Sequence, residues 1–194
     1  SVTTESYYGT DLYKTATGVK IVKKPGTYHS YKSGDTELLG LILEKATGQS
    51  LGDYASDKLW KPLGAEQPAL WSTDKEKGNE KAFCCFNSNA RDFARIGQLM
   101  LDSGKWKGNT IIDSAYYVQS ITACNIPDEE GLPCNYYGYQ WWIRPAYPGV
   151  FYARGIFIPS KKIVLVRLGH KRSGERINGA PKEVDALIDW GMRL

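Results

Sequence analysis

Two short strings in this sequence contain residue types that can perform nucleophilic or proton-transfer chemistry. The first is Ser72-Thr-Asp-Lys75, in which a serine and a lysine are three positions apart. On a helix this spacing places both side chains on one face, where the lysine can activate the serine hydroxyl. The string lies in the polar stretch 72–80, however, which has no apolar periodicity and offers Lys75 no buried helix in which to lose its proton. We therefore do not expect Ser72 to be a nucleophile.

The second string is Tyr31-Lys-Ser33, which directly precedes a predicted helix. A phenol with its usual pKa of ~10 is a poor base at neutral pH. A neighbouring lysine ammonium favours the phenolate, which can then accept or relay a proton. Tyr31 is also one of 13 tyrosines, and on spacing alone the simpler interpretation is that it packs in the core.

Other sites are excluded by missing motifs. The sequence has no G-x-G-x-x-G and no G-K-[ST], and neither histidine has a serine or cysteine at a recognisable catalytic spacing. The four cysteines lack the C-x-x-C spacing of a zinc site. Cys124 and Cys134 flank a polar loop, and they form either a disulfide in an oxidising compartment or two free thiols. We expect no metal and no cofactor.

The composition is that of an ordinary globular protein. Of 194 residues, 42% are hydrophobic and 24% charged, and a net charge of +4 is spread along the chain. Nucleic-acid binding is therefore not expected, because it usually needs clustered basic residues. The longest apolar runs are too short to span a bilayer, and no signal segment opens the chain.

Capping residues and periodicity predict the elements that position these strings. After thirty turn-rich residues, helices are expected from about Asp35 to Gly48, over 51–59 after the cap Ser50, over 88–101, over 114–122 after the cap Asp113, and over 181–193. In the first of these helices an apolar face is formed by Leu38, Leu39, Ile42 and Ala46. Three strands are expected over 136–143, 150–157 and 162–168, the last two joined by a turn at 159–161. Helices followed by strands indicate an α+β fold with an antiparallel sheet.

Five segments in order resemble the serine β-lactamase-related hydrolases, the superfamily of class C β-lactamases, penicillin-binding proteins, DD-peptidases and esterases. Within it they are similar to the branch of aminohexanoate-oligomer hydrolases. The segments are Tyr31-Lys-Ser33, 38–48 (LLGLILEKATG), 59–64 (LWKPLG), 89–97 (NARDFARIG) and 137–142 (YGYQWW).

The resemblance implies a β-lactamase/DD-peptidase-like fold in one domain over 1–194, with helices and loops to about 135 and strands and a helix over 136–194. It also implies hydrolysis of an amide or ester through an acyl-enzyme. Tyr31 would then move the proton, and Ser33 would be the third residue of its box. Ala153-Arg154-Gly155 resembles a further family box, after which the backbone N–H of Ile156 would stabilise an oxyanion. Arg154 and Gly155 would contact the substrate. Tyr137 belongs to the aromatic stretch 136–142, in which alternate residues either line an acyl pocket or face the core, and it is our candidate for the pocket.

Two departures from the family pattern qualify this expectation. The family's Ser-x-x-Lys lies upstream of the tyrosine box, but the 30 residues before Tyr31 contain none. We therefore expect the nucleophile helix and the N-terminal strands to be missing and the chain alone to be inactive. The sequence after Gly155 is also shorter than is usual in the family.

Three readings of this pattern remain open. The chain is a portion of a serine hydrolase, a non-catalytic binding or accessory domain with a decayed site, or a fragment that folds only with its missing part. The expected partners are a small-molecule amide or ester and either the chain's own N-terminal segment or another copy. The resemblance implies a periplasmic or extracellular location.

Overall fold

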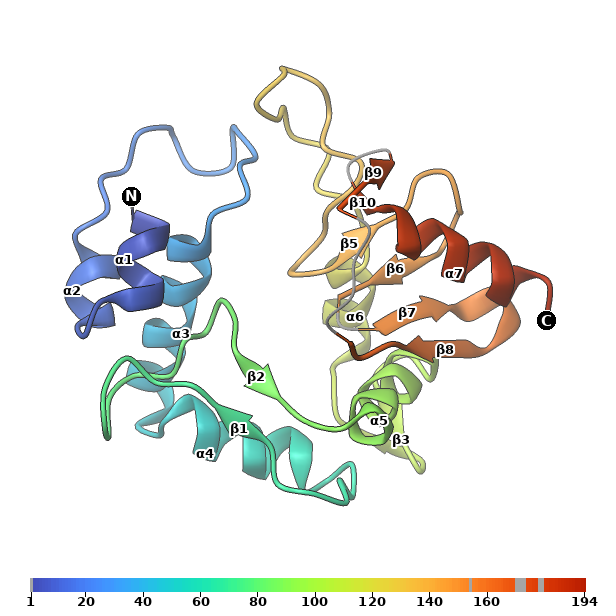
Figure 1. Ribbon diagram of the computed structural model, residues 1–194, viewed down its shortest axis with the longest axis horizontal. Helices are drawn as coiled ribbons and strands as arrows, with labels where there is room; N and C mark the ends of the chain where they lie inside the picture. Colours follow the sequence, from blue (N-terminus) through green and yellow to red (C-terminus); the bar gives the residue numbers. More distant parts are fainter. Residues whose placement is uncertain (1, 154, 170–173, 178–179) are drawn as a thin grey trace. The chain divides into compact units, whose positions relative to one another are not determined.

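A computed structural model describes residues 2–153, 155–169, 174–177 and 180–194. The chain divides into two compact units, each described here by itself (Figure 1). The first unit comprises residues 1–88 and 126–132, and the second comprises 89–125 and 133–194. Within the described residues, no helix is both long and apolar enough to cross a membrane.

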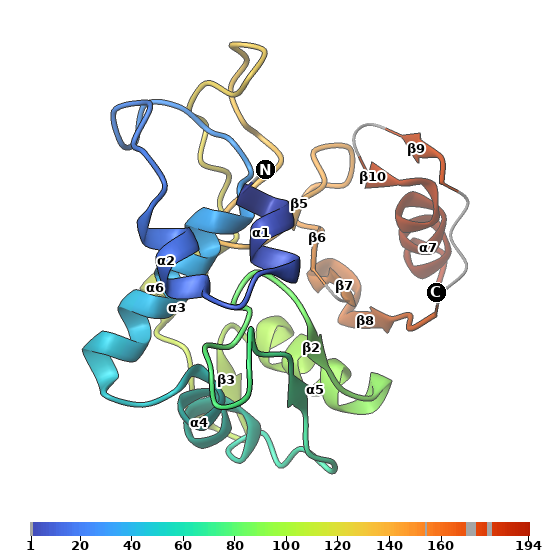
Figure 2. The same cartoon turned by 60° about the vertical axis from the view of Figure 1, so that its left-hand side comes forward.

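The first unit is mainly helical. Its elements are α1 (Val2–Tyr8), α2 (Leu12–Thr17), α3 (Ser33–Thr47), α4 (Leu51–Ala55), a π-helical turn (Ser56–Trp60) and the antiparallel pair β1 (Leu70–Trp71) and β2 (Phe86–Asn87). Helices α1, α2 and α3 pack against one another (Figure 2), and α4 packs against α3.

The first thirty residues correct one expectation. They were predicted to be turn-rich, but α1 and α2 occupy most of the first seventeen. Asp11 caps α2, because its Oδ1 accepts a hydrogen bond from the Lys14 N–H at 2.9 Å. Leu12 and Ala16 are buried on the inner side of α2. Helices this short show too little periodicity to be recognised in the sequence.

Helix α3 is buried on a different face from the one its leucines suggest. Leu39 and Ile42 are 56% and 55% exposed, whereas the buried positions are Gly34, Glu37, Gly40 and Leu41. A Cβ added at Gly40 would lie 2.6 Å from Ala82 Cβ and 3.0 Å from Leu51 Cδ1. The glycine therefore allows α3 to approach its neighbours closely on this face.

The second unit holds a sheet between helices. Its elements are α5 (Ala90–Leu101), β3 (Lys105–Trp106), β4 (Asn109–Thr110), α6 (Ser114–Ser120), β5 (Trp142–Ile143), β6 (Phe151–Tyr152), β7 (Gly155–Ile158), a 3₁₀ turn (Pro159–Lys161), β8 (Ile163–Val166), β9 (Arg176–Ile177), β10 (Ala180–Pro181) and α7 (Lys182–Met192). The main sheet has the order β5-β6-β7-β8, and every pair is antiparallel. With the helices of both units, this confirms the α+β class.

Two of the three expected strands are divided differently. The stretch 150–157 was predicted to be one strand, but it folds back as a hairpin of β6 and β7, with Phe151 opposite Phe157. The stretch 136–143 also turns back on itself, with Tyr137 bridging to Trp142. The third strand and the turn at 159–161 are confirmed by β8 and the 3₁₀ turn.

Both faces of the sheet are covered. On one face, Phe151 and Phe157 pack with Met100 of α5 and Tyr117 of α6. On the other, Ile156 and Ile158 pack with Ile188 of α7, as was expected for the last helix (Figure 1). Alternate residues of β7 thus enter separate cores, as strand geometry requires.

Candidate active site

The tyrosine box lies at the start of α3, as the sequence predicted. Tyr31 is in irregular chain, Lys32 is the extended N-cap residue, and Ser33 is the first residue of the helix. The Tyr31 side chain is 55% exposed. It is therefore a surface residue of its unit and not a core tyrosine.

Backbone and side-chain hydrogen bonds fix the segment that enters this box. The His29 N–H donates to the carbonyl oxygen of Pro127 at 2.7 Å. The Ser30 hydroxyl donates to Glu129 Oε1, also at 2.7 Å. Pro127 and Glu129 lie in the loop 126–132, which belongs to the same unit. The loop 126–132 thus fixes His29 and Ser30, the two residues that form the approach to Tyr31.

Helix α3 is anchored by a buried acid one turn beyond the box. Glu37 is 1% exposed, and its Oε2 accepts the Ala82 N–H at 2.8 Å. Burial, reinforced by the charges of Glu44 and Asp74, raises the pKa of Glu37 to about 7 against the effect of the backbone N–H groups. At mildly acidic pH Glu37 is therefore a neutral group in this core.

Further carboxylates attach the segment 72–85 to the helices. Asp74 accepts the Leu12 N–H at 2.9 Å, Glu80 accepts the Gly52 N–H at 2.9 Å, and Glu44 accepts the Asn79 side-chain amide at 3.0 Å. Burial raises the pKa of Glu44, and the adjacent Glu80 carboxyl adds to this rise. These acids accept hydrogen bonds from backbone and side-chain N–H groups, and no sequence motif predicted this role.

The string Ser72-Thr-Asp-Lys75 is not helical. Ser72 follows β1, and its N–H donates to the Cys85 carbonyl at 3.2 Å. Lys75 lies in a turn, and both side chains are exposed. The spacing that would place them on one helical face is therefore absent, as expected from the polar surroundings.

Cys84 and Cys85, next to this segment, are joined in a disulfide. The spacing of these cysteines excluded a zinc site, but the bond between them was not predicted. The indole N–H of Trp71 donates to the Cys84 and Lys81 carbonyl oxygens, each at 3.0 Å. The disulfide therefore lies in a turn tied to β1.

The remaining candidate residues belong to the second unit. Gly155 begins β7, and Ile156 is in register with Tyr152 of β6 on one side and Leu165 of β8 on the other. Arg154 lies outside the described residues. The N–H of Ile156 thus belongs to a strand that has a neighbour on both sides.

Tyr137 is mostly enclosed in the second unit. It is 8% exposed, its hydroxyl donates to Gln140 Oε1 at 3.2 Å, and its ring meets Trp142 edge-on at 5.0 Å. Of the aromatic residues near it, Tyr139 is 50% exposed, whereas Trp141 packs on the Phe151 core. Tyr31 and Ser33 thus belong to one unit, and Tyr137, Gly155 and Ile156 to the other.

Comparison with known proteins places the chain in a family. The sequence profile described as Beta-lactamase matches residues 2–188. The chain belongs to the Beta-lactamase family. The 6-aminohexanoate-dimer hydrolase of Paenarthrobacter ureafaciens is 32% identical over 119 residues, which cover 58% of this chain and 30% of that protein.

Solved structures agree with this assignment. A Bacillus anthracis protein assigned as a 6-aminohexanoate-dimer hydrolase matches with a TM-score of 0.75 and 29% identity, over 94% of this chain and 47% of that one. The octameric penicillin-binding protein homologue from Pyrococcus abyssi matches with a TM-score of 0.58 and 21% identity, over 89% and 44% respectively, which supports the fold. The chain thus has the serine β-lactamase/penicillin-binding-protein fold and spans less than half the length of these relatives.

Proposed function

We propose that this chain is part of a serine hydrolase that cleaves an amide or ester bond through an acyl-enzyme. The observation that carries the proposal is the exposed Tyr31 at the start of α3, in a chain of the Beta-lactamase family. A relative named for hydrolysis of the 6-aminohexanoate dimer supports a small-molecule substrate.

In this proposal Tyr31 handles the proton of the first step. A serine oxygen bonds to the substrate carbonyl carbon, and Tyr31, together with the lysine of the Ser-x-x-Lys element, passes the hydroxyl proton to the leaving group. Water then releases the acyl group. Ser33 completes the tyrosine box, and the Ile156 N–H stabilises the oxyanion. Arg154, Gly155 and Tyr137 contact the substrate.

The serine and its lysine must come from outside these 194 residues, either from the protein's own N-terminal segment or from another copy. Two observations support this. The residues before Tyr31 contain no Ser-x-x-Lys, and α3 presents a face on which Leu39 and Ile42 are more than half exposed. Large apolar residues gathered on one helix face usually mark a surface that another segment covers.

We further propose a periplasmic or extracellular location. The Cys84–Cys85 disulfide supports it, because disulfides persist in oxidising compartments.

A second function, non-catalytic binding, is favoured by one observation. Ile156 lies within β7 and is in register with Tyr152 of β6 on one side and Leu165 of β8 on the other. A backbone N–H that pairs within a sheet does not bind a substrate oxyanion. In this alternative the site binds a small molecule without turnover.

The test is an acylation assay on the protein with a Ser-x-x-Lys segment present, in the same chain or as a second chain. A nitrophenyl ester should give a burst of acyl-enzyme, and Tyr31→Phe should lower kcat by roughly 10²–10⁴-fold, the usual contribution of a positioned acid–base group. Tyr13→Phe is the matched control, because Tyr13 is 61% exposed in the same unit. Turnover unaffected by Tyr31→Phe would remove the role of Tyr31. The absence of any burst would favour the binding domain.

A further inference from the structure

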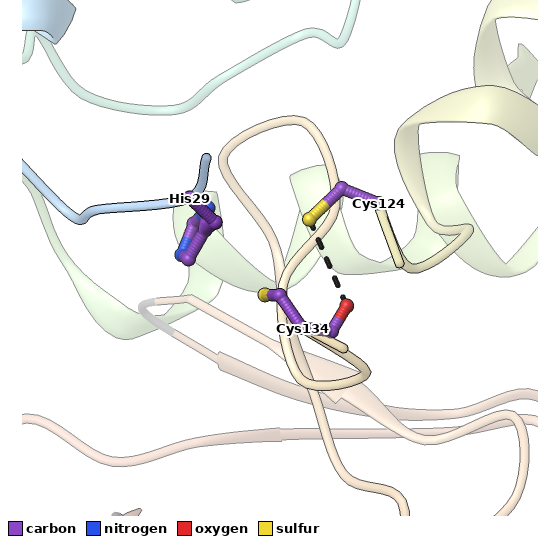
Figure 3. Close-up of side chains that lie close together, drawn as sticks. All are labelled: His29, Cys124 and Cys134. Carbon is purple, nitrogen blue, oxygen red and sulfur yellow. Dashed lines mark hydrogen bonds between the residues drawn. The ribbon is translucent and has the colours of Figure 1, made fainter. Parts of the chain in front are cut away.

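Two cysteines lie close together where the loop 126–132 begins and ends. The Asn125 N–H donates to the Cys134 carbonyl at 3.0 Å, so the chain leaving for the loop and the chain returning from it are neighbours. The Cys124 thiol lies 3.7 Å from the same carbonyl oxygen (Figure 3). The two sulfur atoms are within 4.8 Å of each other. Closing this distance to the ~2.05 Å of a disulfide requires a movement of less than about 3 Å.

We propose that Cys124 and Cys134 form a reversible disulfide that closes this loop at its base. The oxidant is a small disulfide such as oxidised glutathione. The Cys124 thiolate attacks one glutathione sulfur and releases the other as a thiolate. Cys134 then attacks the Cys124 sulfur, and the released thiolate takes the Cys134 proton. One disulfide forms, one is reduced, and two glutathione molecules leave.

The environments of the two thiols give them different parts in this exchange. Cys124 is partly exposed, whereas Cys134 is completely buried. Burial, together with the neighbouring Cys124 thiol, raises the pKa of Cys134 to about 11. Cys124 is therefore the thiol that meets the oxidant, and Cys134 reacts only with the sulfur already beside it.

The bond would act on the loop that holds the approach to Tyr31. Residues 126–132 group with the first unit, whereas both cysteines belong to the second. The loop supplies the Pro127 carbonyl to the His29 N–H and the Glu129 carboxylate to Ser30. A disulfide between Cys124 and Cys134 would restrict the conformations of the loop that contains these two acceptors, Pro127 and Glu129. The inference stands whether or not Tyr31 is catalytic.

The test uses the 194-residue chain equilibrated with reduced or oxidised glutathione. After alkylation, peptide mapping under non-reducing conditions should find residues 124 and 134 linked in the oxidised sample. A bond closing a loop of this length should raise Tm by roughly 5–10 °C. Hydrogen exchange of the His29 amide should be slower in the oxidised form.

Two variants separate this bond from other thiol chemistry. Cys124→Ser should abolish the rise in Tm and should leave Cys134 without glutathione. A chain carrying Cys84→Ser and Cys85→Ser should keep both the link and the rise, since the two pairs are independent. The proposal is overturned if both thiols stay open to alkylation in excess oxidised glutathione. It is also overturned if they carry only glutathione adducts, or if they pair with Cys84 or Cys85 instead.

Discussion

Replacing Glu37 by glutamine should remove a pH dependence from the stability of the first unit. The carboxyl is 1% exposed, and its pKa is raised to about 7 from a usual 4.5, chiefly by burial. Between pH 4.5 and pH 7, the Glu37 carboxyl is therefore protonated in the folded state and ionised in the unfolded state. The stabilisation from this proton is fully present below pH 4.5 and is lost as pH rises through 7. A tenfold change in a proton equilibrium is worth about 1.4 kcal/mol, so the loss amounts to about 3 kcal/mol.

The assay is urea unfolding from pH 4.5 to 8, followed by tryptophan fluorescence. Trp71 reports on the relevant contacts, because its indole donates to carbonyls in the segment that Glu37 holds. Glutamine keeps an oxygen acceptor for the Ala82 N–H and cannot ionise. The unfolding free energy of Glu37→Gln relative to the unchanged chain should rise by about 3 kcal/mol across this range. Glu76→Gln, at an exposed position in the same segment, is the control. Equal pH profiles for Glu37→Gln and the unchanged chain would refute the reasoning.

Two further predictions concern packing and chemistry. Gly97→Ala should destabilise the second unit by about 1–3 kcal/mol, because the new Cβ would meet Val164 and Phe157 of the sheet. Gly169→Ala, where a Cβ meets no atom within 4 Å, should leave the urea midpoint unchanged, and equal midpoints for both variants would contradict this account. A fluorophosphonate should not label Ser72 in the 194-residue chain, since Ser72 and Lys75 lie outside any helix. Mass-spectrometric mapping of the label to Ser72 would show that Ser72 is a working nucleophile. It would overturn the interpretation that this chain lacks the nucleophilic serine.

Local signals explain which elements could be predicted. Ser50 and Asp113 each accept the backbone hydrogen bonds expected of a helix cap, and Gly48 ends α3 with a φ of 69°. These effects depend on residues only a few positions apart, so the sequence alone reveals them. The reversal between β6 and β7 has no comparable signal. The run 150–158 has no Pro-Gly or Asn-Gly pair, and only the pairing of Phe151 with Phe157 reveals the turn.

The same distinction applies to the candidate site. The tyrosine box was recognisable because its three residues are contiguous and directly precede a helix. The loop 126–132 that holds its approach is almost one hundred residues further along the chain, and nothing in either segment indicates that they meet. Glu37 is the clearest case of a residue whose environment the sequence does not predict, because a glutamate next to leucines is expected on the polar, exposed side of α3. Glu37 is buried because Gly40, one turn later, has no side chain and lets Ala82 pack closely against α3. The Ala82 backbone N–H then donates a hydrogen bond to the Glu37 carboxylate. The face of α3 that looks apolar in the sequence is left exposed by this arrangement, and it is therefore the surface on which a covering segment should be sought.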